Sequence, residues 1–344
     1  MHMNDNDLFA DAAREVLAEQ CTPAVVRAIE EGGRNSAVTL ALWEHLEATG
    51  LADALLSEDD GGAGLNLSQV FGVLEQCGAH ALPLPLAETL LARALMVHAG
   101  APRVPGSIAL AQAQVQPDGS WHCALVRNGA MAQAVLAQAG SAWRLLRTAQ
   151  AHSTPQASAL DATLTWTAAQ VETSSVVAMN AALQVRTLQA AVVAAQMAGA
   201  LNQVFLRTLQ YANERQQFGR PIGKFQAIQH QLAVMSEHVF AARMAAQLGC
   251  CGEGVVPDRL RVATAKARCS EAALVVSELA HSIHGAIGFT EEYDLQLFTR
   301  RLHAWRQTAG SEAYWYGVAG EALLAHDGMT LDVVRRITDV QTLQ

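Results

Sequence analysis

The sequence predicts a mostly α-helical protein with a small β domain: a helical N-terminal domain, an antiparallel β middle domain and a C-terminal four-helix bundle. Apolar residues recur at helical spacing near both ends of the chain, which indicates amphipathic helices there. Between these ends, short strand-like runs alternate with turn-forming stretches. We therefore expect the helical N-terminal domain at residues 1–103, the β-sheet domain at 104–183 and the helical bundle at 184–344.

The helical pattern of the N-terminal zone is visible at Leu8, Ala12 and Val16 and continues to about residue 100. Two breaks interrupt it, an acidic and glycine-rich stretch at 58–64 and a Leu-Pro-Leu-Pro stretch at 82–85. Glycine and proline favour turns, so we predict that both breaks are loops between helices.

The middle zone changes to short runs that are typical of a small antiparallel sheet. The predicted strands lie at 107–112, 121–126, 143–147 and 163–167. Turn-forming stretches, such as Gln116-Pro-Asp-Gly119 and Ser153-Thr-Pro155, separate them.

Long helices return after residue 184, each with an apolar stripe. The predicted helices lie at 185–213, 224–248, 258–284 and 293–324. Breaks that contain glycine or proline separate them at 218–221, 252–254 and 285–288. Helices of this length cannot all cover one small core, so we expect an antiparallel bundle that also supplies an oligomer interface.

Composition excludes several classes of protein. Of the 344 residues, 51% are hydrophobic and 16% charged, and the formal net charge is -9. A disordered chain needs low hydrophobicity and high charge, so this chain is expected to fold. The acidic balance argues against nucleic acid as a partner, because binding to phosphates needs a basic surface. The high apolar content instead indicates large helix–helix and subunit interfaces.

The cysteines and the N-terminus indicate the compartment. The six cysteines are scattered and form no CxxC pair, so we expect a reducing cytoplasm rather than a disulfide framework. The N-terminus has acids where a signal peptide has bases. The most apolar run, at 190–201, is too short to span a bilayer and is interrupted by Gln196 and Gly199, so no membrane association is expected.

The most informative segment is Tyr211-Ala-Asn-Glu-Arg-Gln-Gln-Phe-Gly-Arg-Pro-Ile-Gly-Lys-Phe-Gln226. Arg215 is predicted at the end of one long helix, and Lys224 at the start of the next. An arginine at such a corner can offer its rigid fork of donors to a phosphate. Phe218 can cover an apolar ring, and Gln226 can hydrogen-bond to a heterocycle. The alternative is a helix hairpin in which Arg215 only pairs with Glu214 or is solvated at the turn, and the chemistry alone favours it.

The second segment is Ala280-His-Ser-Ile-His-Gly-Ala-Ile-Gly-Phe-Thr-Glu-Glu-Tyr-Asp294. Gly285 and Gly288 permit close approach of the backbone to a ligand such as a pyrophosphate. The alternative is that glycine simply ends the helix. His281 and His284 have no third ligand nearby in the sequence, so no metal site is predicted.

Together these segments resemble the acyl-CoA dehydrogenase family. Residues 215–226 are similar to its flavin-binding R-x-x-F-G-x-x-I-x-x-x-Q stretch, and residues 284–294 to its GG-x-G-F/Y-T loop. Residues 42–65, which contain Glu-Asp-Asp-Gly-Gly-Ala-Gly, resemble its entry helices. The three motifs occur in the family's order, helical, then β, then helical. No strand leads into a GxGxxG motif, which argues against a nicotinamide enzyme.

The resemblance implies FAD as cofactor and α,β-dehydrogenation of an acyl-CoA thioester, with an electron-transfer flavoprotein or a similar protein as electron acceptor. It implies that Arg215 contacts the FAD pyrophosphate, while Gln217, Phe218 and Gln226 contact the adenosine side. It also implies that the loop facing the FAD of a neighbouring subunit carries Ser282, Gly285, Ala286 and Gly288. In that loop Ser282 replaces the usual glutamine and Ala286 the second glycine.

The sequence departs from the family at the catalytic base. By the family pattern the usual glutamate falls on Ala309, and an alternative position falls on Gln189, so neither place has an acid. Glu312 lies about one helical turn past Ala309 and is the candidate base, although a solvated acid in a first helical turn is the simpler interpretation.

The β zone departs as well, because it shows neither the family's T-E-x-x-x-G-S/T stretch nor its W-x-T/S-N stretch. The activity implied by the resemblance is therefore that of an FAD-dependent acyl-CoA dehydrogenase, with two alternatives for this chain. It either acts in a homo-oligomer with its own base, or it is a non-catalytic subunit of a hetero-oligomer in which a catalytic paralogue supplies the base. Retention of Arg215, Phe218 and Gln226 counts against acyl-CoA binding without flavin.

Overall fold

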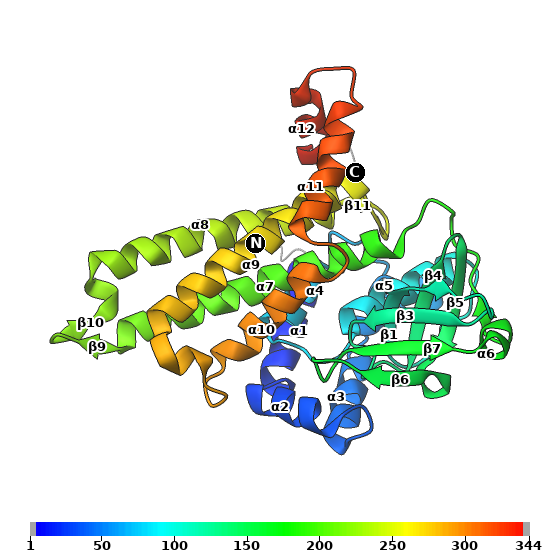
Figure 1. The fold of residues 1–344 in the computed structure, drawn as a ribbon, viewed down its shortest axis with the longest axis horizontal. Helices are drawn as coiled ribbons and strands as arrows, with labels where there is room; N and C mark the ends of the chain where they lie inside the picture. The colour runs from blue at the N-terminus through cyan, green and yellow to red at the C-terminus, as the bar shows by residue number, and fades with distance from the viewer. Residues whose placement is uncertain (1–4, 340–344) are drawn as a thin grey trace. The chain divides into compact units, whose positions relative to one another are not determined.

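The structure is a computed structural model of the chain, and it describes residues 5–339 (Figure 1). Its contacts divide the chain into two compact units. Unit 1 holds residues up to Val73, Leu82–Gln189 and Gly254–Val256, and unit 2 holds Leu74–Ala81, Ala190–Glu253 and the residues from Pro257 onward. The domain boundaries at 103 and 183 stay a prediction.

Helices form the N-terminal part of unit 1, as predicted. They are α1 (Asp5–Gln20), α2 (Pro23–Gly32), α3 (Ala37–Ala48), the short 3₁₀ helices η1 (Leu51–Asp53) and η2 (Glu58–Asp60), the beginning of α4 (Phe71–Ala79), and α5 (Leu86–His98). The breaks predicted at 58–64 and 82–85 are indeed loops around these elements. Helix α5 is the most deeply buried of this group and packs against the first strand of the sheet domain.

A buried charge network anchors α5. The guanidinium of Arg93 is fully buried and donates to Asp53 Oδ1 at 3.0 Å and to the carbonyl of Gly106 at 3.0 Å. It also reaches Glu47 Oε1 at 2.5 Å, and Arg103 binds the same two carboxylates. A buried arginine needs such partners, because an unpaired charge in the interior costs several kcal/mol, on the order of 3 to 5.

The β domain consists of two four-stranded sheets that enclose one apolar core, with Trp121 and Trp166 among its buried residues. One sheet has the strand order β1-β4-β5-β8 and the other β2-β3-β7-β6. The strands are β1 (Ile108–Gln112), β2 (Gln114–Val115), β3 (Trp121–Val126), β4 (Ala134–Ala139), β5 (Ala142–Arg147), β6 (His152–Pro155), β7 (Ala162–Trp166) and β8 (Ser175–Val176). The connections include η3 (Thr148–Gln150) and α6 (Ala168–Glu172).

The four predicted strands are present within one residue of their predicted ends, and four further strands, β2, β4, β6 and β8, were not predicted. Strand β4 is alanine-rich and buried on both faces, so it lacks the alternation that marks a strand. Strand β6 contains the Ser-Thr-Pro stretch that was predicted as a turn, and it lies at a sheet edge, where proline is tolerated. Most pairs are antiparallel as predicted, but β1 and β4 pair in parallel because the chain enters the other sheet between them.

Unit 2 is the predicted bundle of long helices. It comprises most of α7 (Val185–Glu214), then α8 (Gln226–Gly249), α9 (Arg259–His284), α10 (Leu295–Gln307), α11 (Glu312–Leu324) and α12 (Thr330–Thr338). Short connections are β9 (Gln216–Gln217), β10 (Arg220–Pro221), η4 (Ile222–Lys224), β11 (Gly252–Glu253), β12 (Val256–Pro257) and η5 (Gly285–Phe289). Helix α9 contacts α8, α10 and α11 and is the centre of the bundle (Figure 1).

Two glycines bring α4 and α7 into backbone contact within unit 2. A β-carbon at Gly78 would lie 1.8 Å from the carbonyl oxygen of Gln196, and one at Gly199 would lie 1.9 Å from that of Glu75. Any larger residue would push the helices apart. The Glu75 carboxylate also accepts two hydrogen bonds from Arg243 on α8, at 2.6 and 3.1 Å.

The prediction of one helix at 293–324 is wrong. The structure has two helices, α10 and α11, separated by a turn at residues 308–311 that we call the α10–α11 turn. Ala309 and Gly310 both adopt positive φ angles there, 59° and 108°, which a helix cannot contain. Gly310 and the N-cap Ser311 are the signals of this break in the sequence.

By length and composition alone, one helix, at Arg259–Phe289, could cross a membrane. Its α-helical part is α9, whose side chains are largely buried against the neighbouring helices of unit 2. The core helix of a bundle meets the same criteria, so this segment is explained by its packing.

Candidate functional site

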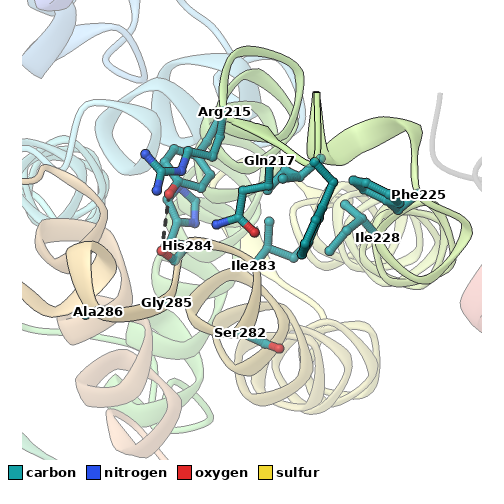
Figure 2. Close-up of a pocket in the computed structure, with 12 residues that line it drawn as sticks. Arg215, Gln217, Phe225, Ile228, Ser282, Ile283, His284, Gly285 and Ala286 are labelled. Carbon is teal, nitrogen blue, oxygen red and sulfur yellow. Dashed lines mark hydrogen bonds between the residues drawn. The ribbon is translucent and has the colours of Figure 1, made fainter. Parts of the chain in front are cut away.

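A pocket of about 500 Å³ lies in unit 2, between the connection from α7 to α8 and the end of α9 (Figure 2). The first connection is a tight β9–β10 hairpin followed by η4. The residues that line the pocket are Tyr211, Arg215, Gln217, Phe218, Ile222, Phe225, Ile228, Ser282, Ile283, His284, Gly285 and Ala286. The structure thus brings together the two segments that the sequence analysis singled out, which lie about 60 residues apart in the chain.

Arg215 is the first residue after α7, and its backbone is fixed on both sides. Its N–H donates to the carbonyl of Tyr211 at 2.8 Å, and its carbonyl accepts from the N–H of Ile222 at 2.8 Å. Within residues 5–339 its guanidinium has no hydrogen bond or ion pair, and the neighbouring Glu214 instead accepts from Gln210 at 2.8 Å. Pairing with Glu214, one form of the alternative interpretation, is therefore absent, whereas the other form, an arginine solvated at the turn, agrees with the exposure of Arg215. The exposed guanidinium keeps all its donors for an anion in the pocket.

The β9–β10 hairpin presents an exposed aromatic ring beside this arginine. Phe218 has a φ of 51° and is 91% exposed, which is unusual for a large apolar side chain. Its ring lies edge-on to Phe225 at 6.2 Å, and the guanidinium of Arg220 lies 4.3 Å from the centre of the Phe225 ring. The hairpin therefore offers both positive charge and apolar ring surface, the combination that suits a phosphate-bearing aromatic ligand.

The other predicted residues of this segment divide into two groups. Gln217 lines the pocket, whereas Gln226 begins α8 and is not among the lining residues. The exposed side chain of Gln226 faces solvent near the hairpin rather than forming a wall. Its predicted contact with a ligand stays a prediction.

The opposite wall of the pocket comes from the end of α9. Ser282, Gly285 and Ala286 line it, and Gly285 needs its freedom because its φ is 65°. Gly288 is buried behind the wall, where a β-carbon would lie 3.0 Å from the β-carbon of His284 and 3.1 Å from Nδ1 of His281. Helix packing therefore suffices to explain Gly288, whereas Ala286 places a methyl group on the pocket surface.

Sequence reasoning did not assign several lining residues to the pocket. These are Tyr211, Ile222, Phe225, Ile228, Ile283 and His284. Tyr211 lies one helical turn before Arg215, so helical spacing could have identified it. His284 lies within the loop that the resemblance assigned to FAD but was itself considered only as a metal ligand, and its ring stacks on Tyr211 with the ring centres 4.4 Å apart.

Comparisons with known proteins agree with this geometry. Residues 179–324 match the family model "Acyl-CoA dehydrogenase, C-terminal domain". Acyl-CoA dehydrogenase IpdE2 of Mycobacterium tuberculosis is 29% identical over 306 residues, which cover 87% of this chain and 91% of that protein. The fold of the ChsE4-ChsE5 complex from Mycobacterium tuberculosis matches with a TM-score of 0.81 at 20% identity, over 95% of this chain and 99% of that one. The Tcur3481-Tcur3483 steroid ACAD matches with a TM-score of 0.79 at 24% identity, over 93% and 97%.

Residues 179–324 match the acyl-CoA dehydrogenase C-terminal domain, and over most of its length the chain is similar to acyl-CoA dehydrogenases. Its fold, helical at both ends with a β middle domain, is that of the family. The motifs quoted from the sequence therefore identified the family correctly.

An acyl-CoA dehydrogenase removes the α-proton with a carboxylate, so the positions of the acids matter. Glu312 forms a two-point ion pair with Arg306, with Nε to Oε2 at 3.0 Å and Nη2 hydrogen-bonded to Oε1. The hydrogen bonds from Arg306 hold the pKa of Glu312 below its usual value. The carboxylate is therefore neutralised within the chain, and it does not line the pocket.

The two positions at which the family pattern places a base have structural partners instead. Ala309 lies in the α10–α11 turn, and its carbonyl accepts from Nε1 of the buried Trp315 at 3.1 Å. Gln189 is buried in unit 1 and donates its amide to the carbonyl of Leu110 at 2.7 Å. Neither side chain can accept a proton from carbon.

The two histidines of the second segment also have local partners. His281 Nε2 lies 3.0 Å from the hydroxyl of Thr299, and its ring stacks on Phe289. His284 bonds to Tyr293 and to its own helix. Burial lowers the pKa of both rings. In the part of the chain that the structure describes, no group of three or more His, Cys, Asp or Glu side chains could hold a metal ion.

Proposed function

We propose that this pocket is one side of an FAD site and that the chain works as a subunit of an FAD-dependent acyl-CoA dehydrogenase. The observation that carries the proposal is the unpaired guanidinium of Arg215, which faces an open pocket of about 500 Å³. An unpaired arginine beside an exposed phenylalanine provides the donors and the apolar surface that an ADP group needs. The pocket residues thus fit the dinucleotide end of FAD.

In this proposal Arg215 binds the pyrophosphate, and Gln217, Phe218 and Gln226 contact the adenosine side. The residues Ser282, Gly285, Ala286 and Gly288 form the loop that meets an FAD held mainly by a neighbouring subunit. Bound FAD supplies the hydride acceptor for the reaction, as flavins do. The chain's own contribution is to bind and orient the ADP end, because it offers fixed charge and a preformed wall there.

We further propose that the chain works with a catalytic paralogue that supplies the base. Ala309 and Gln189 carry no acid, and Arg306 neutralises Glu312. A general base needs a pKa near the operating pH, and the ion pair shifts the pKa of Glu312 in the opposite direction. The fold relatives include ChsE4-ChsE5, described as a complex of two proteins, which supports such an arrangement. The second candidate is a homo-oligomer in which Glu312 leaves Arg306 and acts as the base.

The remaining partners follow from the same proposal. The substrate is an acyl-CoA thioester, and a steroid-like or fatty acyl group suits the relatives. An electron-transfer flavoprotein or a similar protein accepts the electrons. We place the chain in the cytoplasm, which suits the six cysteines, all of which are buried and none of which forms a disulfide.

The test compares the chain alone with the chain co-expressed with a carboxylate-bearing paralogue. The visible absorption spectrum gives the amount of FAD per chain, and light scattering gives the assembly. We expect little FAD on the chain alone and close to full loading with acyl-CoA turnover in the co-expressed assembly. Full loading and turnover by the chain alone would favour the homo-oligomer.

Single substitutions then test the pocket. Arg215→Gln in the assembly is expected to weaken FAD binding by about tenfold or more, because a charge-assisted pair to phosphate is lost. The matched control is Arg335→Gln, which removes an exposed arginine from α12, outside the pocket. Equal FAD affinity in both variants would exclude Arg215 from the cofactor site.

A further inference from the structure

The pocket contains a buried histidine that lies between two tyrosines and that no role has yet explained. His284 is the last residue of α9 and is 4% exposed. Its ring is nearly parallel to that of Tyr211, with an angle of 23° between the planes, and lies 5.2 Å from the ring of Tyr293. Three aromatic residues from α7, α9 and the connection before α10 therefore meet at this point.

The hydrogen bonds fix the protonation of the His284 ring. Nδ1 lies 2.8 Å from the carbonyl oxygen of Ala280, which can only accept, so Nδ1 carries a proton. Nε2 lies 3.2 Å from the hydroxyl of Tyr293. Desolvation by burial lowers the pKa of His284, so the ring is neutral and Nε2 accepts from the tyrosine. This is one tautomer with both nitrogens bound.

The hydrogen bonds of His284 lie directly before the residues that form one wall of the pocket. Its Nδ1 proton ties the side chain to the last turn of α9, directly before Gly285, where the chain turns away. Its backbone carbonyl receives a hydrogen bond from the hydroxyl of Tyr211 at 3.4 Å, a contact that is visible in Figure 2. Gly285 and Ala286 follow immediately and line the pocket with Arg215. His284 is thus held by hydrogen bonds of both its side chain and its backbone, directly before the residues of the pocket wall.

We propose that His284 is a positioning residue, which Tyr211 and Tyr293 hold as a neutral Nδ1–H imidazole and which sets the distance between the Gly285–Ala286 wall and Arg215. The inference rests on the proposed dinucleotide site and adds a residue that sets the shape of that site. His284 touches no reacting atom. It acts by positioning the Gly285–Ala286 wall, and the ligand of the pocket is the phosphate-bearing part of the cofactor.

The other charged groups near the three rings do not change the protonation of His284 or Tyr293. His281, on the same helix, lowers the pKa of His284 further. Around Tyr293 the charges of Arg207, Glu214 and Asp294 oppose one another, and burial remains the main cause that raises the pKa of its hydroxyl. The tyrosine therefore keeps its proton and remains a donor for Nε2.

The experiment measures binding of ADP by isothermal titration calorimetry to the assembly of this chain with its paralogue, freed of FAD, because little cofactor is expected on the chain alone. Tyr293→Phe removes the donor to Nε2 and leaves a buried acceptor without a partner. We expect ADP to bind about fivefold to tenfold more weakly, in line with the loss of one buried hydrogen bond. His284→Ala should lose more, and His284→Asn, which keeps a donor close to the Nδ1 position, should recover part of the affinity. Thr299→Val is the matched control, because it removes the hydroxyl partner of His281, which does not line the pocket.

A spectroscopic measurement separates positioning from general stability. Nitrogen-15 shifts of the histidine rings should show His284 as a single neutral Nδ1–H tautomer at pH 8 in the wild type, and Tyr293→Phe should change this signal while Thr299→Val should not. A charged ring or the Nε2–H tautomer at pH 8 would overturn the inference. Equal ADP affinity in all variants of the assembly would also overturn it while leaving the proposed site intact, whereas a wild-type assembly that binds no ADP at millimolar concentration would remove both.

Discussion

Two corners of the helical bundle carry residues that correspond to functional positions of the family, and their polar groups are satisfied in different ways. At the Arg215 corner, which comprises residues 215–225, the guanidinium of Arg215 has no partner within the described chain, and Phe218 is exposed. At the α10–α11 turn, the carbonyl of Ala309 accepts from Trp315, and Glu312 is paired with Arg306. The Arg215 corner therefore has polar and apolar groups that can contact a ligand, whereas the polar groups of the α10–α11 turn are already hydrogen-bonded within the chain.

A buried lysine adds hydrogen bonds at the α10–α11 turn, which we call the closed corner because its polar groups are paired within the chain. The Arg215 corner is correspondingly called the open corner. Nζ of Lys266 donates to Ser270 Oγ at 2.9 Å and to the carbonyls of Arg306 and Gly310 at 2.9 and 3.0 Å. These carbonyls lie at the end of α10 and in the turn, where helical partners are missing. The difference between the corners teaches where this chain still has groups for a ligand: the proposed cofactor contacts at the Arg215 corner are exposed, whereas the groups at the α10–α11 turn are hydrogen-bonded within the chain.

The largest expected effect comes from truncating the tryptophan at the centre of the closed corner. Trp315 is fully buried in a cluster with Ala190, Val262 and Ala267. Trp315→Ala should lower the free energy of unfolding by about 3 to 5 kcal/mol, because it leaves a large cavity. Trp315→Phe should cost less, since it keeps one aromatic ring in the cluster, although it loses part of the indole volume and the hydrogen bond to Ala309.

The open corner supplies the control for this prediction. Phe218→Ala removes a side chain that is 91% exposed and should change the free energy of unfolding by less than about 0.5 kcal/mol. Urea titrations of both variants measure the contrast. A large loss on Phe218→Ala, or a small one on Trp315→Ala, would reverse the assignment of the two corners.

The second prediction concerns Lys266 and the pH dependence of stability. Burial lowers the pKa of Lys266 to about 7 in the folded chain, below its value of about 10.4 in an unfolded one. Between these values the unfolded state binds the proton more readily, so the unfolding free energy of the wild type rises with pH. From pH 7 to 9 the gain from this group should be about 2 kcal/mol.

Lys266→Met should remove this gain, and the exposed Lys224→Met is the matched control. The measurement is a urea titration of each variant at pH 7 and pH 9. An equal pH slope in wild type and Lys266→Met would mean that the lysine remains charged in the folded chain throughout this range.

Much of the fold was predictable from the sequence because helical periodicity is strong in it. The predicted start of the helix at 258–284 agrees with the structure because Asp258 caps α9, accepting hydrogen bonds from Leu260 and Arg261. Strand β4 was missed because its alanines and buried side chains show no alternation. The break at Gly310 was missed because the apolar residues on either side of it still suggest one continuous helix.

The candidate site was predictable in its parts and less so in its assembly. Motif spacing identified Arg215 and the loop around Gly285, since both lie at helix ends marked by glycine or proline. The aromatic contact between Tyr211 and His284 joins residues about 70 positions apart, and local patterns carry no information on such a pairing. The ion pair that neutralises Glu312 is closer in sequence, yet whether two such side chains meet depends on the left-handed turn between them.

The third prediction tests the role of Glu312 directly. Glu312→Gln removes the ion pair with Arg306 and should lower the free energy of unfolding at pH 7 by about 1 kcal/mol, because the pair is only partly exposed. Its pKa is lowered in the folded chain, so this contribution is present above about pH 4.3, the unfolded value, and is lost as the pH falls through the folded pKa.

Acyl-CoA turnover of the assembled enzyme distinguishes the two interpretations of this residue. If Glu312 only closes the turn, turnover of the Glu312→Gln assembly should remain within about twofold of the wild type at a temperature where both are folded. Loss of turnover with an unchanged FAD content would instead identify Glu312 as the base.

The smallest expected effect comes from the backbone of the closed corner. Ala309 has a φ of 59°, a left-handed conformation that costs an alanine about 1 kcal/mol and a glycine almost nothing. Ala309→Gly relieves this strain, but it also gives the unfolded chain more freedom, so a net gain in stability of about 0.5 kcal/mol is expected. Thermal unfolding at pH 7 should show a small rise in melting temperature. A clear fall would mean that the packing of the Ala309 methyl group against the Trp315 cluster outweighs the strain of its left-handed backbone.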